Sequence, residues 1–474
     1  MKRYFTLLLV AIITLTSLTM FAGVRDLPVK KTGGKEYYYY KVGKGESVAG
    51  IANALGITPE EIILHNRRAA GGVDKKMTLY FPVDAYAAPV EEVVEVEEVL
   101  VPDSHALRPA IVVALPFGLD NPTPTRTNRL ALDFYRGFLL AADTLSQRGS
   151  AIEIVAVDTE GADFADRIAD TAVATAQVTV APAEADRMAT LASLAADRGS
   201  WVLNVLNVPD TLYAVNAHVL QANVPQRNMY ALAADAFIAD YADYTPVVLR
   251  CDAGKNEKEA FVSYLTGRLE SKGILPVEIS YEDNLTSSHL DRLAPGGKYV
   301  FVPLSGSLAE FNKFAYALKS WRDRLAAEAD AAAAENPDSY ATTSVALFGY
   351  PDWTVFRGDA LDMLHRLEAK VYSRFYDNFH SFDARTLESS FRRWYGEPIL
   401  ESVPSQAILG YDTGCYLIKN LRANNGEFNP TYPARYQGIQ STFDFDRDGD
   451  AGYYNSSLYI INYLPGDGIS SRVL

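Results

Sequence analysis

Apolar and polar positions alternate in two different periods along the chain from residue 109 onward. Short apolar runs such as AIVVALP (110–116) and IEIVAVD (152–158) have the length and composition of buried strands. Between them, apolar residues recur at helical spacing. In the helix expected from about residue 130 to 147, this stripe comprises Leu132, Tyr135, Leu139 and Ala142. The pattern predicts β-α-β units, in which helices cover both faces of a parallel sheet.

The same rhythm continues to about residue 351. Further strands are expected at 177–182, 201–209, 246–251, 276–281, 299–304 and 344–351. Further helices are expected at 166–176, 188–199, 216–222, 257–272 and 309–334, and the alanine-rich stretch 326–339 extends the last of them into solvent. Two successive sets of strand–helix units predict two α/β lobes.

Composition narrows the class of protein. The chain has 474 residues, too many for a single compact core, and 48% of them are hydrophobic, so most of the chain is globular. The formal charge of −15 disfavours nucleic-acid binding, because an acidic surface repels phosphate backbones. Two cysteines and six scattered histidines exclude a disulfide-stapled scaffold and a Cys/His zinc framework.

The N-terminus has the organisation of a secretory signal peptide. Lys2 and Arg3 precede an apolar run from Thr6 to Ala22, and we assign residues 1–23 to the signal. An uncleaved membrane anchor is the alternative, because the run is marginally long enough to span a bilayer. No cysteine lies near the expected cut, and no second run of 18 apolar residues follows. We therefore expect a protein exported to the periplasm or cell envelope that has no lipid anchor and is not an integral membrane protein after cleavage.

Two shorter zones lie between the signal and the α/β region. Residues 37–83 form a small, slightly basic unit, whereas residues 84–108 contain the stretch VEEVVEVEEVLVP. Its glutamates repel one another, and Pro89 and Pro102 interrupt regular pairing, so we expect an extended acidic linker. The alternation of Val with Glu leaves a strand as the other interpretation.

The small unit contains two helix starts between two strands. Ser47, together with Glu46, directly precedes a helical stripe and is placed to cap it; the stripe comprises Val48, Ile51, Ala52 and Leu55. Thr58, with Pro59 next and Glu61 three residues on, starts a second helix in a capping-box arrangement. Alternating apolar residues mark the flanking strands: Tyr40 and Val42, and Leu79 and Phe81.

This order and spacing resembles the LysM domain, a small β-α-α-β fold that binds peptidoglycan. The matching positions are Tyr40, Val42, Gly45, Ser47, Val48, Ile51, Ala52, Leu55, Gly56, Ile57, Thr58, Ile62, Asn66, Leu79 and Pro82. The resemblance implies a shallow groove for an N-acetylglucosamine-containing glycan. One wall comprises Gly45, Glu46, Ser47 and Val48, and the other comprises Asn66 and Arg67. The stretch AAGGVDKK (69–76) departs from the short turn of the family, and helix capping is the alternative role of Ser47.

Several short blocks of the region 109–474 resemble the type I periplasmic-binding-protein fold, in the branch fused to LysM modules in exported bacterial proteins. The blocks are 133–145, 152–161, 299–314, 347–356, 391–399, 407–421 and 436–463. The expected fold class is therefore α/β, with a bilobed type I periplasmic-binding-protein fold of two parallel-sheet lobes preceded by a β-α-α-β LysM module. The resemblance implies three segments that cross between the lobes and a hinge that closes on a ligand. We assign residues 109–235 and about 383–425 to the first lobe, and residues 245–380 with the C-terminal strands to the second.

Residues just after strands are the candidates for a ligand cleft, because ligands of open parallel sheets bind beyond the carboxyl ends of the strands. They are Ser305, Ser307, Tyr350 and Asp352 in the second lobe, and Asp158, Asn204 and Asn207 in the first. Amino-acid-binding members of the family hold the ligand carboxylate with hydroxyls and backbone N–H groups and its ammonium with an acid. The two serines, which open a helix, fit the first role, with helix capping as the alternative, and Asp352 fits the second. Ala183-Glu184 stands where the family has a first-lobe hydroxyl, which argues against an ordinary amino-acid clamp.

Two further features suggest chemistry without a complete set of residues. DFDRDGD (444–450) begins like an EF-hand loop, but its twelfth position is Asn455 instead of Glu, so we interpret it as a hairpin turn, with calcium binding as the alternative. Cys415 follows Asp412 on an apolar helix and no histidine lies beyond His380, so we interpret it as a buried core thiol; a disulfide to Cys251 stays open. We expect no enzyme activity, metal or cofactor.

Two functions from different classes follow. The first is a non-enzymatic peptidoglycan-binding protein whose bilobed domain binds a small ligand, such as an amino acid, a peptide or a wall fragment. The second is a scaffold or activator that contacts cell-wall synthesis enzymes, because the outer-membrane activators of penicillin-binding proteins resemble this fold too. The missing first-lobe hydroxyl favours the second. The ligand, the protein partner and the oligomeric state are not determined by the sequence.

Overall fold

The computed structural model describes residues 23–24, 27–32, 35–86, 110–146, 151–206, 211–336, 342–376 and 381–474. Apart from Gly23 and residues 84–86, the expected signal peptide and acidic linker lie outside this part of the chain. The chain divides into two compact units, one comprising Met1–Ser104 with His380–Phe382 and the other His105–Phe379 with Asp383–Leu474. No helix within the described ranges combines the length and apolar character needed to cross a membrane.

The N-terminal module has the expected β-α-α-β order and one additional strand. Its antiparallel sheet has the order β1-β2-β3, formed by β1 (Val29–Thr32), β2 (Lys35–Lys41) and β3 (Thr78–Pro82). The helical elements are α1 (Val48–Leu55), α2 (Pro59–His65), η2 (Arg67–Gly71) and α3 (Val83–Tyr86). Ser47 caps α1 by accepting the N–H of Gly50 at 3.1 Å, and Thr58 and Glu61 form the predicted capping box.

The first lobe of the larger unit contains a seven-stranded sheet with the order β16-β17-β8-β7-β6-β4-β5. Neighbouring strands are parallel except for β16 and β17. The strands are β4 (Ala110–Leu115), β5 (Glu153–Asp158), β6 (Val178–Ala181), β7 (Trp201–Asn204), β8 (Val219–Gln221), β16 (Phe445–Arg447) and β17 (Tyr453–Asn455). Every residue of β4 is buried, as a sheet covered on both faces requires.

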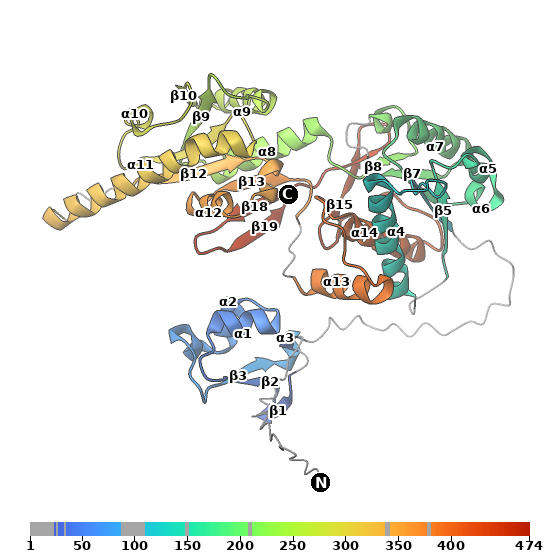
Figure 1. Cartoon of the computed structure of the whole chain (residues 1–474), viewed down its shortest axis with the longest axis horizontal. Coiled ribbons are helices and arrows are strands. Elements are labelled where there is room, and N and C mark those ends of the chain that lie inside the picture. Colours follow the sequence, from blue (N-terminus) through green and yellow to red (C-terminus); the bar gives the residue numbers. More distant parts are fainter. Residues whose placement is uncertain are drawn as a thin grey trace, which may run out of the picture. The chain divides into compact units, whose positions relative to one another are not determined.

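Helices cover both faces of this sheet (Figure 1), and alternate residues of β4 pack against two different groups of them. Ile111 and Val113 pack with α4 (Arg126–Leu145) and α14 (Gln406–Ala423). Ala110 and Val112 pack with α5 (Phe164–Ala169), α6 (Thr171–Ala174) and α7 (Ala185–Arg198) on the other face. A further helix, α13 (Phe382–Tyr395), packs against α4 and α14.

The second lobe contains another seven-stranded sheet, with the order β10-β9-β11-β12-β13-β18-β19. Its first five strands are parallel, and β18 and β19 are antiparallel additions at one edge. The strands are β9 (Thr245–Cys251), β10 (Val277–Tyr281), β11 (Lys298–Pro303), β12 (Ser344–Gly349), β13 (Lys370–Ser373), β18 (Tyr459–Tyr463) and β19 (Ile469–Val473).

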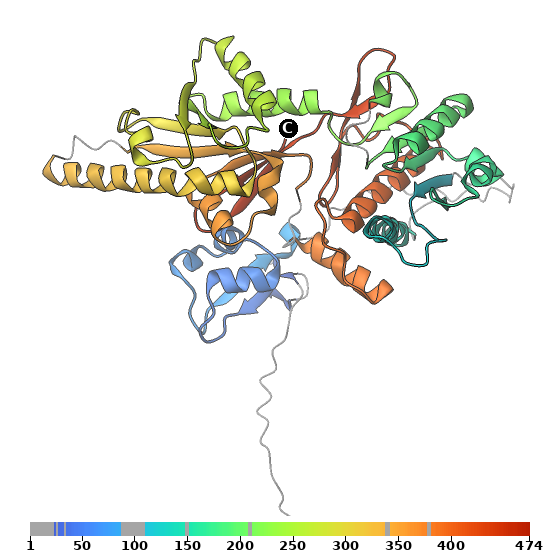
Figure 2. The ribbon, with the colours of Figure 1, turned by 45° about the horizontal axis from the view of Figure 1, so that its top comes forward.

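Among the described residues, the second lobe contains five α-helices. They are α8 (Gln226–Asp240), α9 (Glu259–Glu270), α10 (Ser287–Leu290), α11 (Leu308–Glu335) and α12 (Asp359–Arg366). Figure 2 shows α11 running beyond the edge of the sheet, and most of its last ten residues are exposed. The expected solvated extension of this helix is therefore confirmed as far as Glu335.

Within the described residues, the chain crosses between the lobes at residues 222–225, at residues 374–376 between β13 and α13, and at residues 456–458. The expected lobe boundary at residue 235 is wrong, because α8 contributes Met229, Ala233 and Phe237 to the core of the second lobe. The C-terminal strands are also divided, since β16 and β17 join the first lobe and β18 and β19 the second. The helix expected at 216–222 is wrong as well: Val219–Gln221 is a fully buried strand, and periodicity does not separate strand from helix in so short an apolar run.

Helices α4 and α14 approach so closely that their backbones touch at glycines. A Cβ atom on Gly137 would lie 1.9 Å from the carbonyl oxygen of Ala407, and one on Gly410 would lie 1.9 Å from that of Phe134. Gly414 continues the contact, with a Cβ position 2.8 Å from Cβ of Ala141. No larger residue fits at 137 or 410 unless the two helices move apart.

We predict that Gly137→Ala lowers the free energy of unfolding by about 1–3 kcal/mol or more, because overpacking forces a backbone shift. Gly267→Ala, inside α9 with no neighbour within 4 Å of the added Cβ, is the matched control. It should raise stability by about 0.5–1 kcal/mol through helix propensity alone. Urea unfolding of the full chain measures both, and equal effects of the two substitutions would contradict the close packing.

Asp412, in the middle of α14, ties that helix to the segment 439–441. Its carboxylate accepts the backbone N–H groups of Ile439 at 2.7 Å and of Gln440 and Ser441 at 3.0 Å each. The carbonyl oxygen of Gln440 accepts the N–H of Tyr376, in the second crossing segment, at 3.0 Å. Burial raises the pKa of Asp412 to about 7, while the three backbone donors act in the opposite direction.

This raised pKa predicts a pH dependence of stability. The folded state retains a proton on Asp412 that the unfolded chain loses near pH 4, so this contribution to stability declines as the pH rises from about 4 to about 7. Asp412→Asn removes the titration and should flatten the change in melting temperature across that range. An unchanged slope in the Asn variant would show that Asp412 is ionised throughout.

Candidate functional site

The strand order reverses once in each lobe, and these two places are the candidate site. The chain passes from β4 to β5 on one side and then to β6 on the other; in the second lobe it passes from β9 to β10 and then to β11. Open α/β sheets bind ligands at such switch points, beyond the carboxyl ends of the strands. The loops there are 116–125 and 182–184 in the first lobe, and 252–258 and 304–307 in the second.

In the second lobe, Ser305 and Ser307 follow β11 and lie in the loop at the switch point. The Ser305 hydroxyl donates to Oε1 of Glu257 at 2.9 Å, and the backbone N–H of Gly306 donates to the same oxygen at 2.8 Å. Ser307 is the N-cap of α11, and its hydroxyl accepts the N–H of Glu310 at 3.3 Å. The donors expected to hold a ligand carboxylate therefore already hold a carboxylate of the chain, on a residue that the sequence analysis missed.

Asp352 also lies beyond the carboxyl ends of the strands, in η5 (Pro351–Val355) after β12. Its carboxylate accepts a hydrogen bond from Lys258 Nζ at 2.7 Å, and 46% of its side chain is exposed. The acid expected to bind a ligand ammonium is thus at the predicted place but is paired with an ammonium of the chain.

Tyr350 is not a cleft residue. It is fully buried, its hydroxyl donates to the carbonyl oxygen of Pro303, and burial raises its pKa well above the usual value. Its ring packs among other aromatic side chains, namely Phe261, Trp353 and Tyr372. Tyr350 belongs to the core because the chain turns inward after β12, and position after a strand does not show which way a side chain points.

The predicted residues of the first lobe are engaged in the same way. The Asp158 carboxylate accepts the N–H groups of three consecutive residues, Phe117 at 3.0 Å, Gly118 at 3.1 Å and Leu119 at 2.8 Å. It therefore binds the loop after β4 at the switch point. The assignment of Asn204 to the cleft is wrong: it is fully buried and donates to Gln221 Oε1 at 2.7 Å, joining β7 to β8. Asn207 lies outside the described residues.

In the N-terminal module, one predicted groove wall is the loop between β2 and α1. Gly45 has a left-handed backbone (φ 83°), and Gly45, Glu46 and Ser47 are exposed, whereas Val48 is half-buried. Glu46 shapes this loop, since its carboxylate accepts the Tyr40 hydroxyl at 2.8 Å and the Gly43 N–H at 2.6 Å. Burial and this acidic partner raise the pKa of Tyr40 to about 12.

The other predicted wall begins at the end of α2. The Asn66 side chain donates to the carbonyl oxygens of Ile62 and Tyr80 and accepts the Tyr80 N–H at 2.8 Å, so it joins α2 to β3. Arg67, next to it, is exposed. The departure from the usual short turn, at residues 69–76, begins within η2. The first wall follows the end of β2, where the N–H of Val42 donates to the Met77 carbonyl oxygen at 3.0 Å, whereas Asn66 is bonded to Tyr80 in the middle of β3.

Other sequence features have structural roles. Cys251 and Cys415 are free and lie in the cores of different lobes, so the disulfide alternative is wrong and the buried-thiol interpretation of Cys415 is confirmed. Burial raises the pKa of Cys415 to about 11, which favours the inert thiol. The acidic stretch 444–450 enters the hairpin of β16 and β17, as predicted. No group of three or more His, Cys, Asp or Glu side chains among the described residues is arranged to hold a metal ion.

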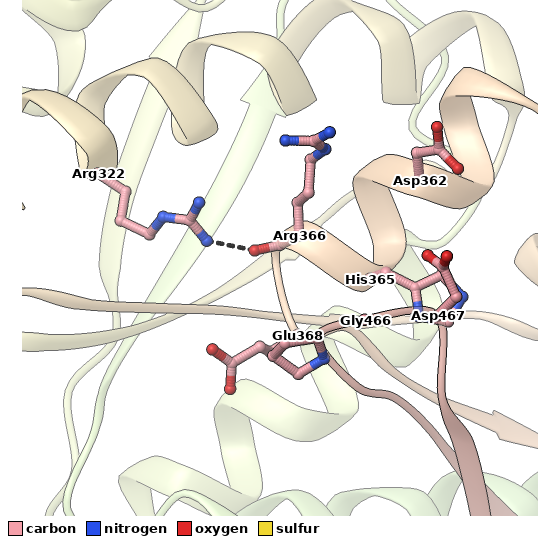
Figure 3. Close-up of a pocket in the computed structure, with 8 residues that line it drawn as sticks. Arg322, Asp362, His365, Arg366, Glu368, Gly466 and Asp467 are labelled. Atoms are coloured by element: carbon pink, nitrogen blue, oxygen red, sulfur yellow. Dashed lines mark hydrogen bonds between the residues drawn. The ribbon is translucent and has the colours of Figure 1, made fainter. Parts of the chain in front are cut away.

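Besides the switch points, the described residues of the larger unit line at least two cavities. One, of about 490 Å³, lies between α11, α12 and the β18–β19 turn, on the side of the second sheet opposite the switch point (Figure 3). There Arg322 donates to the carbonyl oxygen of Arg366 (Figure 3). The other, of about 10 Å³, lies among the crossing segments beside Asn223 and Arg374. It has room for about one water molecule.

The fold is shared with solved structures, although no protein-family model and no curated protein sequence matches the chain. A putative branched-chain amino acid ABC transporter from Rhodospirillum rubrum is similar over 78% of this chain and 100% of its own, at 13% identity and a TM-score of 0.51. An ABC transporter substrate-binding protein from Desulfitobacterium hafniense in complex with Leu covers 77% of this chain and 100% of its own, at 18% identity and a TM-score of 0.40.

The C-domain of LpoA from Haemophilus influenzae, a regulator of PBP1A, is similar over 77% of this chain and 99% of its own, at 13% identity and a TM-score of 0.42. At these identities the likeness concerns the fold alone, and the Rhodospirillum rubrum structure carries it. The larger unit, with its two sheets and three crossings, has the bilobed type I periplasmic-binding-protein fold.

Proposed function

We propose that this protein is an exported, non-enzymatic component of the cell envelope. In this proposal the N-terminal module binds the N-acetylglucosamine-containing glycan of peptidoglycan, and the bilobed unit is a scaffold for cell-wall synthesis enzymes. The acidic linker lets the two units act at one place on the wall, which raises their effective concentration.

The choice of scaffold over receptor depends on one observation. At both switch points, the groups that a small ligand would need are bonded within the chain: Ser305 and Gly306 to Glu257, Asp352 to Lys258, and the loop 117–119 to Asp158. Any polar ligand would have to replace these bonds with its own. A surface with its polar groups already satisfied is better suited to contact a protein partner than to capture a polar solute.

Glycan binding by the module is supported by its loop between β2 and α1. Exposed backbone at Gly45 and the exposed Ser47 hydroxyl provide polar partners for acetamido groups, and Val48 provides apolar surface for their methyls. The loop is held in shape by Glu46, whose bonds to Tyr40 and Gly43 do not depend on a ligand. The wall is therefore preorganised, which reduces the entropic cost of binding a flexible sugar chain.

A small-ligand receptor is the second candidate. It is supported by the fold, which is shared with the putative branched-chain amino acid transporter at a TM-score of 0.51, and by the position of Asp352 and Ser305 at adjacent strand ends. On this alternative, the internal bonds at the strand ends exchange for bonds to the ligand.

The role of Ser47 is testable apart from its role as a helix cap. Ser47→Asn keeps a good N-cap, so the module should remain folded, but it replaces the hydroxyl in the proposed groove. We predict a several-fold loss of binding when the full chain is sedimented with purified peptidoglycan. Thr58→Asn, the same kind of substitution at the cap of α2, should bind as the wild type does. Wild-type binding by both variants would remove Ser47 from the glycan site.

The scaffold function and the receptor function predict opposite results with the wild-type chain. A scaffold should show no change in melting temperature with free amino acids, and should raise the rate of peptidoglycan cross-linking by a bifunctional penicillin-binding protein from the same organism. A receptor at 100 times its Kd would be stabilised by about 2.7 kcal/mol, a visible shift. A saturable shift that disappears in Asp352→Asn, without any effect on cross-linking, would reverse our choice.

A further inference from the structure

We infer that Glu257 and Lys258 act as an internal ligand, whose carboxylate and ammonium occupy the two places in the second lobe where the corresponding groups of an amino acid would bind. The inference rests on the proposed scaffold function and deepens it, because it names the residues that exclude free amino acids from this lobe. These two residues are specificity-determining and are not catalytic.

The carboxylate half of the internal ligand lies at the switch point itself. Glu257 is in the loop after β9, and Ser305 and Gly306 are in the loop after the neighbouring strand β11. One carboxylate oxygen receives both the Ser305 hydroxyl and the Gly306 N–H, at 2.9 and 2.8 Å. A hydroxyl and a backbone N–H just ahead of a helix are the partners that a ligand carboxylate would take here.

The ammonium half is bound by an acid and an aromatic ring. Lys258 Nζ lies 2.7 Å from Asp352 Oδ2 and 5.3 Å from the centre of the Tyr350 ring. Only 21% of the Lys258 side chain is exposed. An acid beside an aromatic face is a favourable site for a primary ammonium group, and here Lys258 occupies it.

The two halves come from consecutive residues and are placed by the backbone. The N–H of Lys258 donates to the carbonyl oxygen of Leu304 at 3.0 Å, which holds the loop against the end of β11. A Cβ on Gly306 would lie 2.8 Å from Cε of Lys258 and 3.0 Å from Oδ2 of Asp352, so the ion pair lies directly on the backbone of Gly306. The chain thus brings a carboxylate and an ammonium together, as a free amino acid does, and leaves no space between them and the loop.

Because Glu257 and Lys258 occupy these two places, the second lobe discriminates against free amino acids. A free amino acid offers the same two charges as Glu257 and Lys258, so it gains no type of bond that the chain does not already make. It also loses translational freedom, which the tethered residues do not. The internal pair therefore wins this competition, and the second lobe stays closed to amino acids.

The test is a double variant of the full chain, Glu257→Ala with Lys258→Ala, titrated with L-alanine and L-leucine and followed by melting temperature and calorimetry. The matched control is Asp252→Ala with Lys255→Ala, which removes one exposed acid and one exposed lysine from the same loop. We expect no binding by the wild type or the control, and a saturable rise in melting temperature in the double variant. Adding Ser305→Ala to the double variant should abolish that rise.

The other possible results contradict either the internal ligand, the scaffold function or both. A folded double variant that binds neither amino acid overturns the internal ligand and leaves the scaffold function intact. Equal binding by the wild type and the double variant overturns both. If the double variant gains binding while the wild type has no effect on peptidoglycan cross-linking, the internal ligand stands and the scaffold function fails.

Discussion

The contact between the backbones of α4 and α14 is the constraint from which the organisation of the larger unit follows. Gly137 and Gly410 let the two helices touch without intervening side chains. One helix comes from the start of the unit and the other follows the whole parallel part of the second sheet. The chain must therefore leave the first lobe and return to it, and it crosses a third time to add β18 and β19. Neither lobe is a continuous segment, so the stability of each depends on the crossings.

Buried polar anchoring supports this arrangement. Asp412 extends from α14 to three backbone N–H groups beside the second crossing segment, and Asn455 donates to the carbonyl oxygens of Ala222 and Thr442 beside the first and third. These bonds provide partners for buried backbone groups. Each such group would cost about 1–3 kcal/mol if it were buried without a hydrogen bond. They also link the crossing segments to the core of the first lobe, where a hinge would have to bend.

The same use of side chains recurs at the strand ends, where this fold can hold a ligand. Asp158 binds the loop after β4, and Glu257 binds the loop after β11. In both places a carboxylate of the chain takes the donors that a ligand anion would require. The polar groups of the loops at the switch points are already hydrogen-bonded within the chain. Such loops agree better with a surface for a protein partner, as proposed, than with a cleft that captures solutes. In the proposed function a separate module binds the glycan, so that attachment to the wall would place no demand on the bilobed unit.

Local chemistry could be predicted from the sequence because it depends on neighbours in the chain. The caps at Ser47 and Thr58, strands such as β4, β5, β9 and β11, and the length of α11 all follow from spacing within a few residues. Whole-chain relations could not be predicted in this way. That α8 belongs to the second lobe, that Tyr350 faces the core and that Glu257 meets Ser305 all depend on contacts between segments far apart in the sequence. The sequence determined most of the elements and the residues placed after those strands. Only the tertiary structure decided which of these residues are buried, which are paired and which remain for a partner, since packing and hydrogen bonding between distant segments set these outcomes.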